Sequence, residues 1–153
     1  MNKYKSNNNI VFTCKYHIIW CPKYRRKVLV GDVEKRLKEI INELALELNV
    51  EIIEMETDID HIHILIDIDP QFGVMKFIRL AKGRSSKLLR DEFHHLKTKL
   101  PTLWTNSSFI STVGGDPLEI VVKQYIENQQ ASERPKEKNK WKNYLKECEV
   151  KND

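Results

Sequence analysis

Apolar positions along the chain follow two periods, which predicts a mixed fold of strands and helices. Four segments are rich in β-branched and aromatic residues, and we interpret them as strands. They are residues 10–20 (IVFTCKYHIIW), 50–57 (VEIIEMET), 62–68 (IHILIDI) and 108–113 (SFISTV). The second and third segments are separated only by a short polar stretch at 58–60, which predicts a β-hairpin.

Apolar residues at helical spacing predict three helices. The first begins near Gly31, with Asp32 as the expected N-cap. The second runs from about Val74 to Leu96. The third covers 116–129 (DPLEIVVKQYIENQ), where the initial Asp-Pro is a strong start signal. The apolar stripes of the first two helices consist of Val33, Leu37, Ile40, Ile41, Leu44 and Leu48, and of Val74, Phe77, Ile78, Ala81, Leu88, Leu89 and Phe93.

The order strand, helix, strand, strand, helix, strand predicts the α+β ferredoxin-like fold, also called split βαβ. In this fold one antiparallel sheet has its helices packed on one face, as in RNA-recognition modules, whose open sheet face binds nucleic acid. A further C-terminal helix would carry Tyr125. We expect a single domain over 1–153, with a core at about 10–130 and a charged tail at about 132–153.

Composition narrows the class of protein. Hydrophobic residues make up 41% and charged residues 31% of the 153 residues, which is typical of a globular protein. The net charge of +4 favours an anionic partner. No apolar run approaches the roughly 18 residues that span a bilayer, and the N-terminus lacks a signal peptide, so we expect a cytoplasmic protein with no membrane partner. Three cysteines without a CxxC motif, Cys14, Cys21 and Cys148, are expected to be reduced thiols.

The stretch DHIHILIDID (60–69) places two histidines in one strand. Side chains alternate between the two faces of a sheet, so the isoleucines at 62, 64, 66 and 68 should fill the core. His61 and His63 would share the other face with Leu65 and Asp67, with their Cα atoms about 6–7 Å apart. This spacing suits two ligands of one divalent metal. Imidazoles alone would suit zinc, copper, nickel or iron, whereas added oxygen ligands favour magnesium or manganese. Two unconnected surface histidines are the alternative.

Tyr125 and Gln129 are four residues apart, which places them on one face of the third helix. A tyrosine hydroxyl can act as a covalent nucleophile, and a glutamine carbonyl is a hard oxygen ligand. With two neutral imidazoles and one amide, a metal would keep its full double charge for polarising a phosphodiester. An ordinary core tyrosine and a solvated glutamine are the alternatives at this point.

Five segments in this order resemble the single-tyrosine HUH transposases (TnpA type) of small insertion sequences that move as single-stranded DNA. Here U stands for a hydrophobic residue. The segments are YHIIWCPKYRRKVL (16–29), DHIHILI (60–66), KGRSSKLL (82–89), LWTNSSFISTVGG (103–115) and YIENQ (125–129). The resemblance covers roughly residues 10–130. It departs at Ser108, where family members often carry an aromatic residue.

The resemblance implies the residues of the reaction. His61, His63 and Gln129 would hold Mg²⁺ or Mn²⁺. Tyr125 would attack the scissile phosphate of single-stranded DNA, leaving a 5′-phosphotyrosine and a free 3′-OH. A second 3′-OH would later reverse this step, without ATP. The sequence has no GxxxxGK[ST] loop, so no nucleotide cofactor is expected.

The resemblance also implies partners. Similar enzymes recognise subterminal DNA hairpins and work as homodimers, and in many the tyrosine helix of one subunit completes the site of the other. Whether Tyr125 acts in cis or in trans is open. No general base is evident from the sequence, and we interpret Asp67 as a surface or supporting residue rather than a catalytic one.

Three basic clusters are candidate DNA contacts, with solvated surface as the alternative. They are KYRRK (23–27), KGRSSK (82–87) and RPKEKNKWK (134–142), and glutamates within and beside the last weaken its case. In the first two clusters, basic residues would contact phosphates and Tyr24 would stack on a base. The expected contacts are Lys23, Tyr24, Arg25, Arg26, Lys82, Arg84 and Lys87.

Two other functions are compatible with the same strand order. A relaxase-like or domesticated HUH enzyme would nick strands for another purpose. A non-catalytic RNA-recognition-like domain would bind nucleic acid only, but it would carry stacking aromatics where this chain has His61 and His63.

Overall fold

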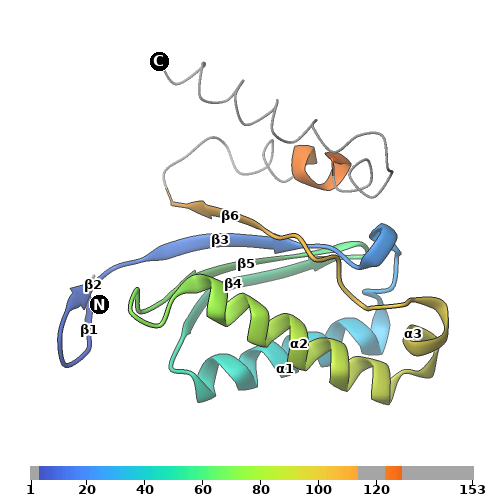
Figure 1. Ribbon diagram of the computed structural model, residues 1–153, viewed down its shortest axis with the longest axis horizontal. Helices are drawn as coiled ribbons and strands as arrows, with labels where there is room; N and C mark the ends of the chain where they lie inside the picture. Colours follow the sequence, from blue (N-terminus) through green and yellow to red (C-terminus); the bar gives the residue numbers. More distant parts are fainter. Residues whose placement is uncertain (1–3, 114–122, 129–153) are drawn as a thin grey trace. The chain divides into compact units, whose positions relative to one another are not determined.

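The computed structural model describes residues 4–113 and 123–128, which belong to two units that are described separately. The first unit contains a four-stranded antiparallel sheet with the order β4-β5-β3-β6, and two long helices cover one face of it (Figure 1). This is the strand order of a ferredoxin-like fold, so the predicted fold class is confirmed. The main elements are β3 (Lys15–Trp20), α1 (Gly31–Glu47), β4 (Glu51–Asp58), β5 (His61–Asp67), α2 (Val74–Glu92) and β6 (Phe109–Thr112).

The core lies between the sheet and the two helices. The strand side contributes Ile18 and Trp20 from β3 and the isoleucines of β5, all 0% exposed. The helix side contributes the predicted apolar stripes, of which Leu37 and Phe77 are fully buried. Each large apolar side chain buried in this way stabilises the fold by about 1.5–3 kcal/mol, which explains why the two central strands hold a single register.

Helix α1 begins one residue earlier than the expected cap. Val30 occupies the N-cap position without a side-chain hydrogen bond, and Gly31 opens the helix at a φ of +56°. Glycine adopts this conformation without steric cost. The prediction of Asp32 as the N-cap is therefore wrong; its carboxylate lies in the first turn, where it interacts favourably with the helix dipole.

The segment predicted as one strand over 10–20 is two strands. Residues Val11–Phe12 form β2, which pairs with β1 (Lys5–Ser6) in a separate two-stranded sheet. The break falls before β3, where the backbone N–H of Cys14 donates to the Asp67 carboxylate at 3.0 Å and the Cys14 carbonyl accepts from Ile68. The Asp67 side chain thus accepts the hydrogen bond that a backbone carbonyl would accept in a regular antiparallel sheet.

The helix predicted over 74–96 also divides in two. Helix α2 ends at Glu92, Phe93 has extended backbone angles, and α3 (His94–Lys99) follows. Phe93 packs against the core, so a tertiary contact outweighs continued helical periodicity here. The predicted hairpin is confirmed, since β4 and β5 are joined by a two-residue turn at 59–60.

The described part of the second unit is the helical segment 123–128. It lies within the predicted helix 116–129 and contains Tyr125, as expected. The remainder of that helix, including Gln129, lies outside the described residues, as do Gly114, Gly115, Cys148 and the charged tail. Among the described helices, none has the length and apolar character needed to cross a membrane.

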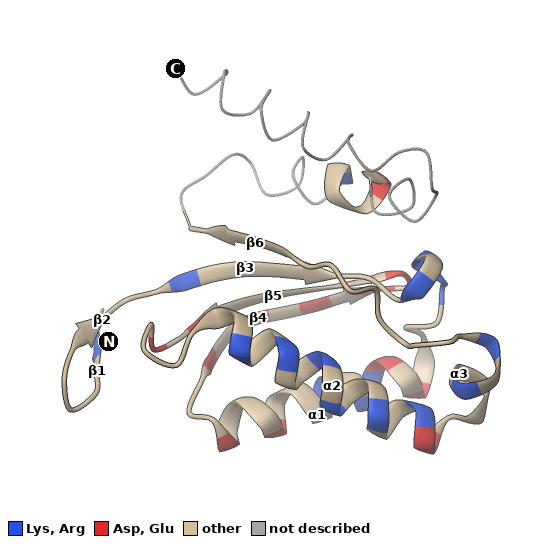
Figure 2. Ribbon diagram, viewed as in Figure 1, with Lys and Arg blue, Asp and Glu red and all other residues tan. Residues whose placement is uncertain are grey.

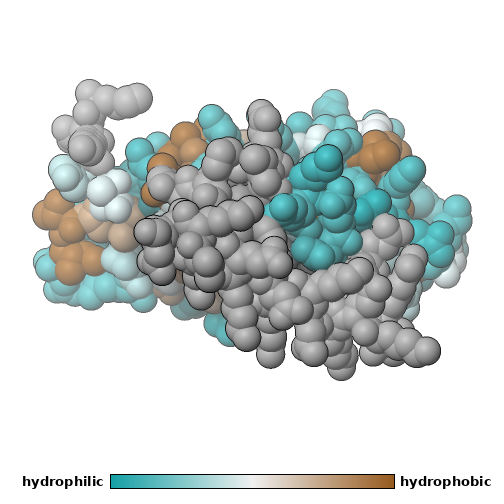
Figure 3. Space-filling view, turned by 90° about the horizontal axis from the view of Figure 1, so that it is seen from above, coloured by the Kyte–Doolittle hydropathy of each residue, from teal (hydrophilic) through white to brown (hydrophobic). Residues whose placement is uncertain are grey.

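In the view of Figure 3, brown apolar patches lie among hydrophilic residues on the part of the surface that is not drawn in grey. Exposed apolar side chains such as Val11 and Leu46 come from different elements. Isolated exposed residues of this kind are normal for globular proteins.

Truncating the core should be costly, whereas truncating the exposed face of α1 should not. Ile64 is fully buried and Leu46 is 84% exposed. We expect Ile64→Ala to lower the free energy of unfolding by about 2–5 kcal/mol and Leu46→Ala by less than about 0.5 kcal/mol, measured by urea denaturation. Equal losses from the two variants would contradict the core described above.

Candidate active site

Strand β5 carries the two predicted histidines on the sheet face opposite α1 and α2. Ile62, Ile64 and Ile66 are in the core, so alternation directs His61 and His63 to the other face, as predicted. His63 is only 7% exposed, so it is not a solvated surface histidine.

His61 is held by a carboxylate in the hairpin turn. Its Nδ1 lies 2.9 Å from Oδ1 of Asp60, and the other Asp60 oxygen lies 3.1 Å from Nε of Arg25. Because the carboxylate accepts, Nδ1 of His61 is the donor, and Nε2 is the ring nitrogen that is left to bind a ligand in the neutral tautomer. This is the usual arrangement around metal-binding histidines. Asp60 was missed as a site residue in the sequence, although it directly precedes the histidine motif.

A third histidine, His17 on β3, contacts His63. The register pairs His17 with Leu65 and Ile19 with His63, so both imidazoles lie on the same sheet face. His17 Nδ1 is 3.1 Å from His63 Nε2, and the rings stack with centroids 5.3 Å apart. No local sequence signal identifies His17, because the contact depends on the pairing of β3 with β5.

Burial keeps the contacting pair neutral. Burial lowers the pKa of His63 below its usual 6.5, and a charge on His17 would lower it further. Burial also lowers the pKa of His17, opposed by the negative charge of Glu54. Both rings are therefore neutral at pH 7, the form in which imidazole can bind a metal.

The described residues supply two of the ligands that a divalent metal would need. The imidazoles of His61 and His63 share one sheet face; His61 is oriented by a carboxylate, and His63 is kept neutral by burial. The residues described include no group of three or more His, Cys, Asp and Glu side chains placed to hold a metal ion. Glu54 and Glu56 on β4 share the face, with Glu56 opposite His63, and both are exposed. A further ligand would have to come from elsewhere, such as Gln129, which lies outside the described residues.

Asp67 is structural. It is 3% exposed and accepts the hydrogen bond from the Cys14 backbone that anchors the start of β3. Its interpretation as a surface residue is therefore wrong. Its supporting role is to hold the backbone at Cys14 by this hydrogen bond, and not to orient an imidazole.

Tyr125 lies in the helical segment 123–128 and is 3% exposed. It belongs to the second unit, so its assignment as the nucleophile stays a prediction here.

The first basic cluster forms the short 3-10 helix η1 (Lys23–Arg25). Tyr24 has a φ of +57° and is 50% exposed, and the Lys23 ammonium lies 5.3 Å from its ring centroid. Arg25 contacts Asp60, so this cluster is joined to the histidine site. Arg26 is exposed. An exposed ring beside cations is compatible with the predicted DNA contact.

The second cluster lies on α2, and two of its three basic residues have protein partners. The Lys82 ammonium donates to the carbonyls of Thr105 at 2.6 Å and Ser107 at 3.0 Å, and burial lowers the pKa of Lys82 to about 8. Arg84 pairs with Glu47 at 2.5 Å. Lys87 is exposed. DNA contact by these residues stays a prediction.

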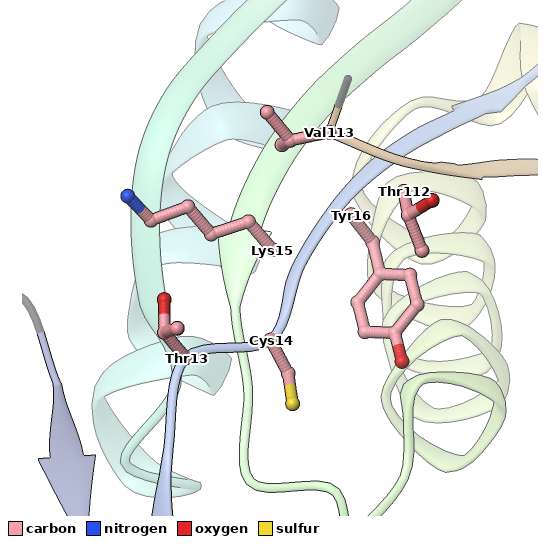
Figure 4. Close-up of a pocket in the computed structure, with 6 residues that line it drawn as sticks. All are labelled: Thr13, Cys14, Lys15, Tyr16, Thr112 and Val113. Carbon is pink, nitrogen blue, oxygen red and sulfur yellow. The ribbon is translucent and has the colours of Figure 1, made fainter. Parts of the chain in front are cut away.

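A pocket of about 280 Å³ lies where β3 begins and β6 ends (Figure 4). Its lining is Thr13, Cys14, Lys15, Tyr16, Thr112 and Val113. None of the three histidines lines it, so it is separate from the imidazole cluster.

Comparisons with known proteins agree with one another. The family model described as "Transposase IS200 like" matches residues 10–129. The chain is 37% identical over 131 residues to the ISDra2 transposase TnpA of Deinococcus radiodurans, which covers 84% of this chain and 93% of that protein. It is 36% identical to the transposase for insertion sequence element IS200 of Salmonella typhimurium, covering 84% and 85%.

Two solved structures are similar. A crystal structure of a Deinococcus radiodurans protein described as a transposase has a TM-score of 0.76 and 34% identity, and covers 82% of this chain and 97% of that one. A REP-associated tyrosine transposase solved with a REP hairpin has a TM-score of 0.52 at 10% identity, covering 80% and 68%, which shows likeness of fold alone.

The buried imidazole pair should make stability depend on pH. Because the folded-state pKa of His63 is below its unfolded value of 6.5, stability is full above pH 6.5 and is lost as pH falls through the folded-state pKa. We expect His63→Asn to flatten this dependence in denaturation curves measured from pH 7.5 to 5. The exposed His94 gives the control, His94→Asn, which should keep the wild-type dependence. The same slope in wild type and His63→Asn would contradict the assignment.

Proposed function

The chain belongs to the IS200-like transposase family, and from this premise we propose that it cleaves and rejoins single-stranded DNA at insertion-sequence ends. The proposed intermediate is a 5′-phosphotyrosine on Tyr125. The observation that carries the proposal is the pair of imidazoles on one sheet face, His61 held by Asp60 and His63 held by His17.

His61, His63 and Gln129 are the proposed ligands of Mg²⁺ or Mn²⁺, which when bound would polarise a non-bridging phosphate oxygen. The protein's own contribution is to present imidazole lone pairs. Asp60 fixes the His61 ring so that Nε2 is free, and burial keeps a proton off His63. Since proton and metal compete for the same lone pair, this environment favours metal binding at neutral pH.

The phenolic oxygen of Tyr125 attacks the phosphorus atom, and the bond from phosphorus to the 3′ oxygen breaks. The phenol loses its proton, the departing 3′ oxygen gains one, and the strand is left with a free 3′-OH. In the reverse direction a different 3′-OH attacks the phosphotyrosine and releases the phenol. The ester bond energy is retained in the intermediate, so no nucleotide is consumed.

We propose DNA hairpins at the transposon ends as the partner. The REP-associated tyrosine transposase of similar fold was solved bound to a REP hairpin. The exposed Tyr24, flanked by Lys23, Arg25 and Arg26, supports a contact beside the histidines, because Arg25 bonds the same Asp60 that holds His61. A non-catalytic RNA-recognition-like domain is disfavoured, since this sheet face carries His61 and His63, the latter opposite Glu56, instead of stacking aromatic residues.

The decisive test is covalent attachment. Labelled single-stranded DNA from the flanks of the gene is incubated with the protein and Mn²⁺, then run on a denaturing gel. We expect an adduct with wild type and none with Tyr125→Phe, which should still bind the DNA because only the hydroxyl is lost. Tyr24→Phe serves as the matched control and should form the adduct. An adduct with Tyr125→Phe would show that Tyr125 is not the nucleophile.

Mixing variants distinguishes cis from trans action in the proposed homodimer. Tyr125→Phe and His63→Ala are each expected to be inactive alone. If the tyrosine of one subunit serves the histidines of the other, mixed dimers regain one working site. Restored adduct formation on mixing indicates trans action, and continued inactivity of proven mixed dimers indicates cis action.

Asp60 should set metal affinity. Asp60→Asn replaces the carboxylate that accepts from His61, and we expect Mn²⁺ binding to weaken by about 10–100-fold, measured by titration calorimetry without DNA. Asp58→Asn, an exposed position in the same hairpin, is the control and should leave binding unchanged. Equal affinities in both variants would show that Asp60 does not support a metal ligand.

A further inference from the structure

The two motif histidines differ at Nε2, the ring nitrogen that lies farther from the backbone. In His61 the engaged nitrogen is Nδ1, which bonds Asp60, and Nε2 is left for a ligand. In His63 the engaged nitrogen is Nε2 itself, which lies 3.1 Å from Nδ1 of His17. Because Nε2 extends farther from the strand, it is the atom of each ring that can reach an ion shared by both. The nitrogen that a shared ion needs is therefore occupied in His63.

The contact between His17 and His63 has the length of a hydrogen bond. Its nitrogen-to-nitrogen distance of 3.1 Å lies within the usual range for a nitrogen donor. In a neutral pair one of the two nitrogens donates and the other accepts. Nε2 of His63 thus either carries a proton or directs its lone pair at His17. In neither case can the same nitrogen bind a metal ion at the same time.

Strand register and burial maintain this contact. Ile19 pairs with His63, so His17, two residues before Ile19, lies diagonally across from His63 on the same sheet face. His63 is only 7% exposed, which leaves little room for water to replace the His17 ring. A buried polar atom that loses its partner is costly. The contact should therefore persist until another ligand for Nε2 arrives.

The flanking strands make an exchange of partners feasible. Strand β4 carries four acidic side chains and no basic one, and Figure 2 shows red positions on it. Glu54 and Glu56 lie on the face of His63, with Glu56 directly opposite it, so their charge attracts a cation to this part of the sheet. On the other side, Ser111 of β6 pairs with His17. Its hydroxyl gives a displaced imidazole a polar group to bond.

We propose that His17 caps Nε2 of His63 and has to be displaced before a divalent ion can bind both motif histidines. The capped form keeps the His63 ring oriented and its Nε2 satisfied while no ion is present. His61 would bind an entering ion first, and His63 would follow once the His17 ring has turned away. The inference rests on the proposed function, because it requires a metal ion at these two histidines.

The exchange leaves the number of protons on the two rings unchanged. Where His17 donates in the capped form, the lone pair of His63 Nε2 is released directly. Where His63 donates, its proton is lost from Nε2 to water and one is gained at Nδ1. Metal binding therefore has to break one hydrogen bond within the protein, and the cap lowers the metal affinity by the equilibrium factor of that bond.

The test measures Mn²⁺ binding by titration calorimetry with the full chain and without DNA. His17→Phe keeps a ring but has no nitrogen, whereas His17→Asn places an amide near the position of Nδ1. The matched control is His94→Phe, the same change at an exposed histidine of α3. Thermal melting in EDTA checks that each variant is folded, and His17→Ala replaces His17→Phe if the phenyl ring prevents folding.

We expect His17→Phe to bind Mn²⁺ about 2–10-fold more tightly than wild type, the factor that corresponds to one net intramolecular hydrogen bond. His17→Asn restores a partner for Nε2 and should keep an affinity close to that of wild type. His94→Phe should match wild type. This order of affinities is specific to a cap, because removing a residue that bound the ion, or that only oriented His63, would weaken binding.

If His17→Phe binds Mn²⁺ as wild type does or more weakly, the cap is wrong while the metal site of the proposed function stands. If His17→Asn binds as tightly as His17→Phe, a hydrogen bond at Nε2 is not what limits binding, and the cap is again wrong. If His63→Ala binds as tightly as wild type, or no variant binds Mn²⁺, both the cap and the proposed metal ligands are overturned.

Discussion

The burial of one face of β5 under α1 and α2 is the constraint on which the candidate site depends. Ile62, Ile64 and Ile66 have no exposed surface, so their side chains cannot exchange faces with those of the residues between them. A slip of one residue would move every isoleucine to the open face and both histidines into the core, at a cost of several kcal/mol. The hydrophobic core thus fixes the direction of the imidazoles.

The same register brings in residues from other strands. Pairing of β3 with β5 puts His17 against His63, and the tight turn between β4 and β5 puts Asp60 against His61. Each histidine of the motif therefore has one ring nitrogen engaged by a partner. A histidine with one fixed nitrogen has a defined ring orientation, which is what a metal ligand requires. The pairing of the strands and the hairpin turn are therefore enough to orient both imidazole rings.

The basic side chains fall into two groups, those that contact oxygen atoms of the protein and those that do not. Lys82, Arg84 and Arg25 belong to basic clusters, but each contacts an oxygen of the protein. The hydrogen bonds of Lys82 connect α2 to the loop before β6, and burial lowers the pKa of Lys82. Lys76, Arg79 and Lys87, also on α2, are exposed and leave their charge to solvent or to a ligand. The distinction separates cations that hold the fold from cations that remain available to an anion.

The sequence alone determined the strand and helix order, the ferredoxin-like class, the face on which His61 and His63 lie and the family resemblance. All of these depend on local periodicity or on short motifs, which are read directly from neighbouring residues. Tertiary structure decided the breaks at Cys14 and Phe93, the burial of Asp67, and the partners of His17, Asp60 and Lys82. These features depend on which distant residues are paired across the sheet or packed on it. The free energy of such contacts outweighs local propensity, and it cannot be inferred from the residues of one segment alone.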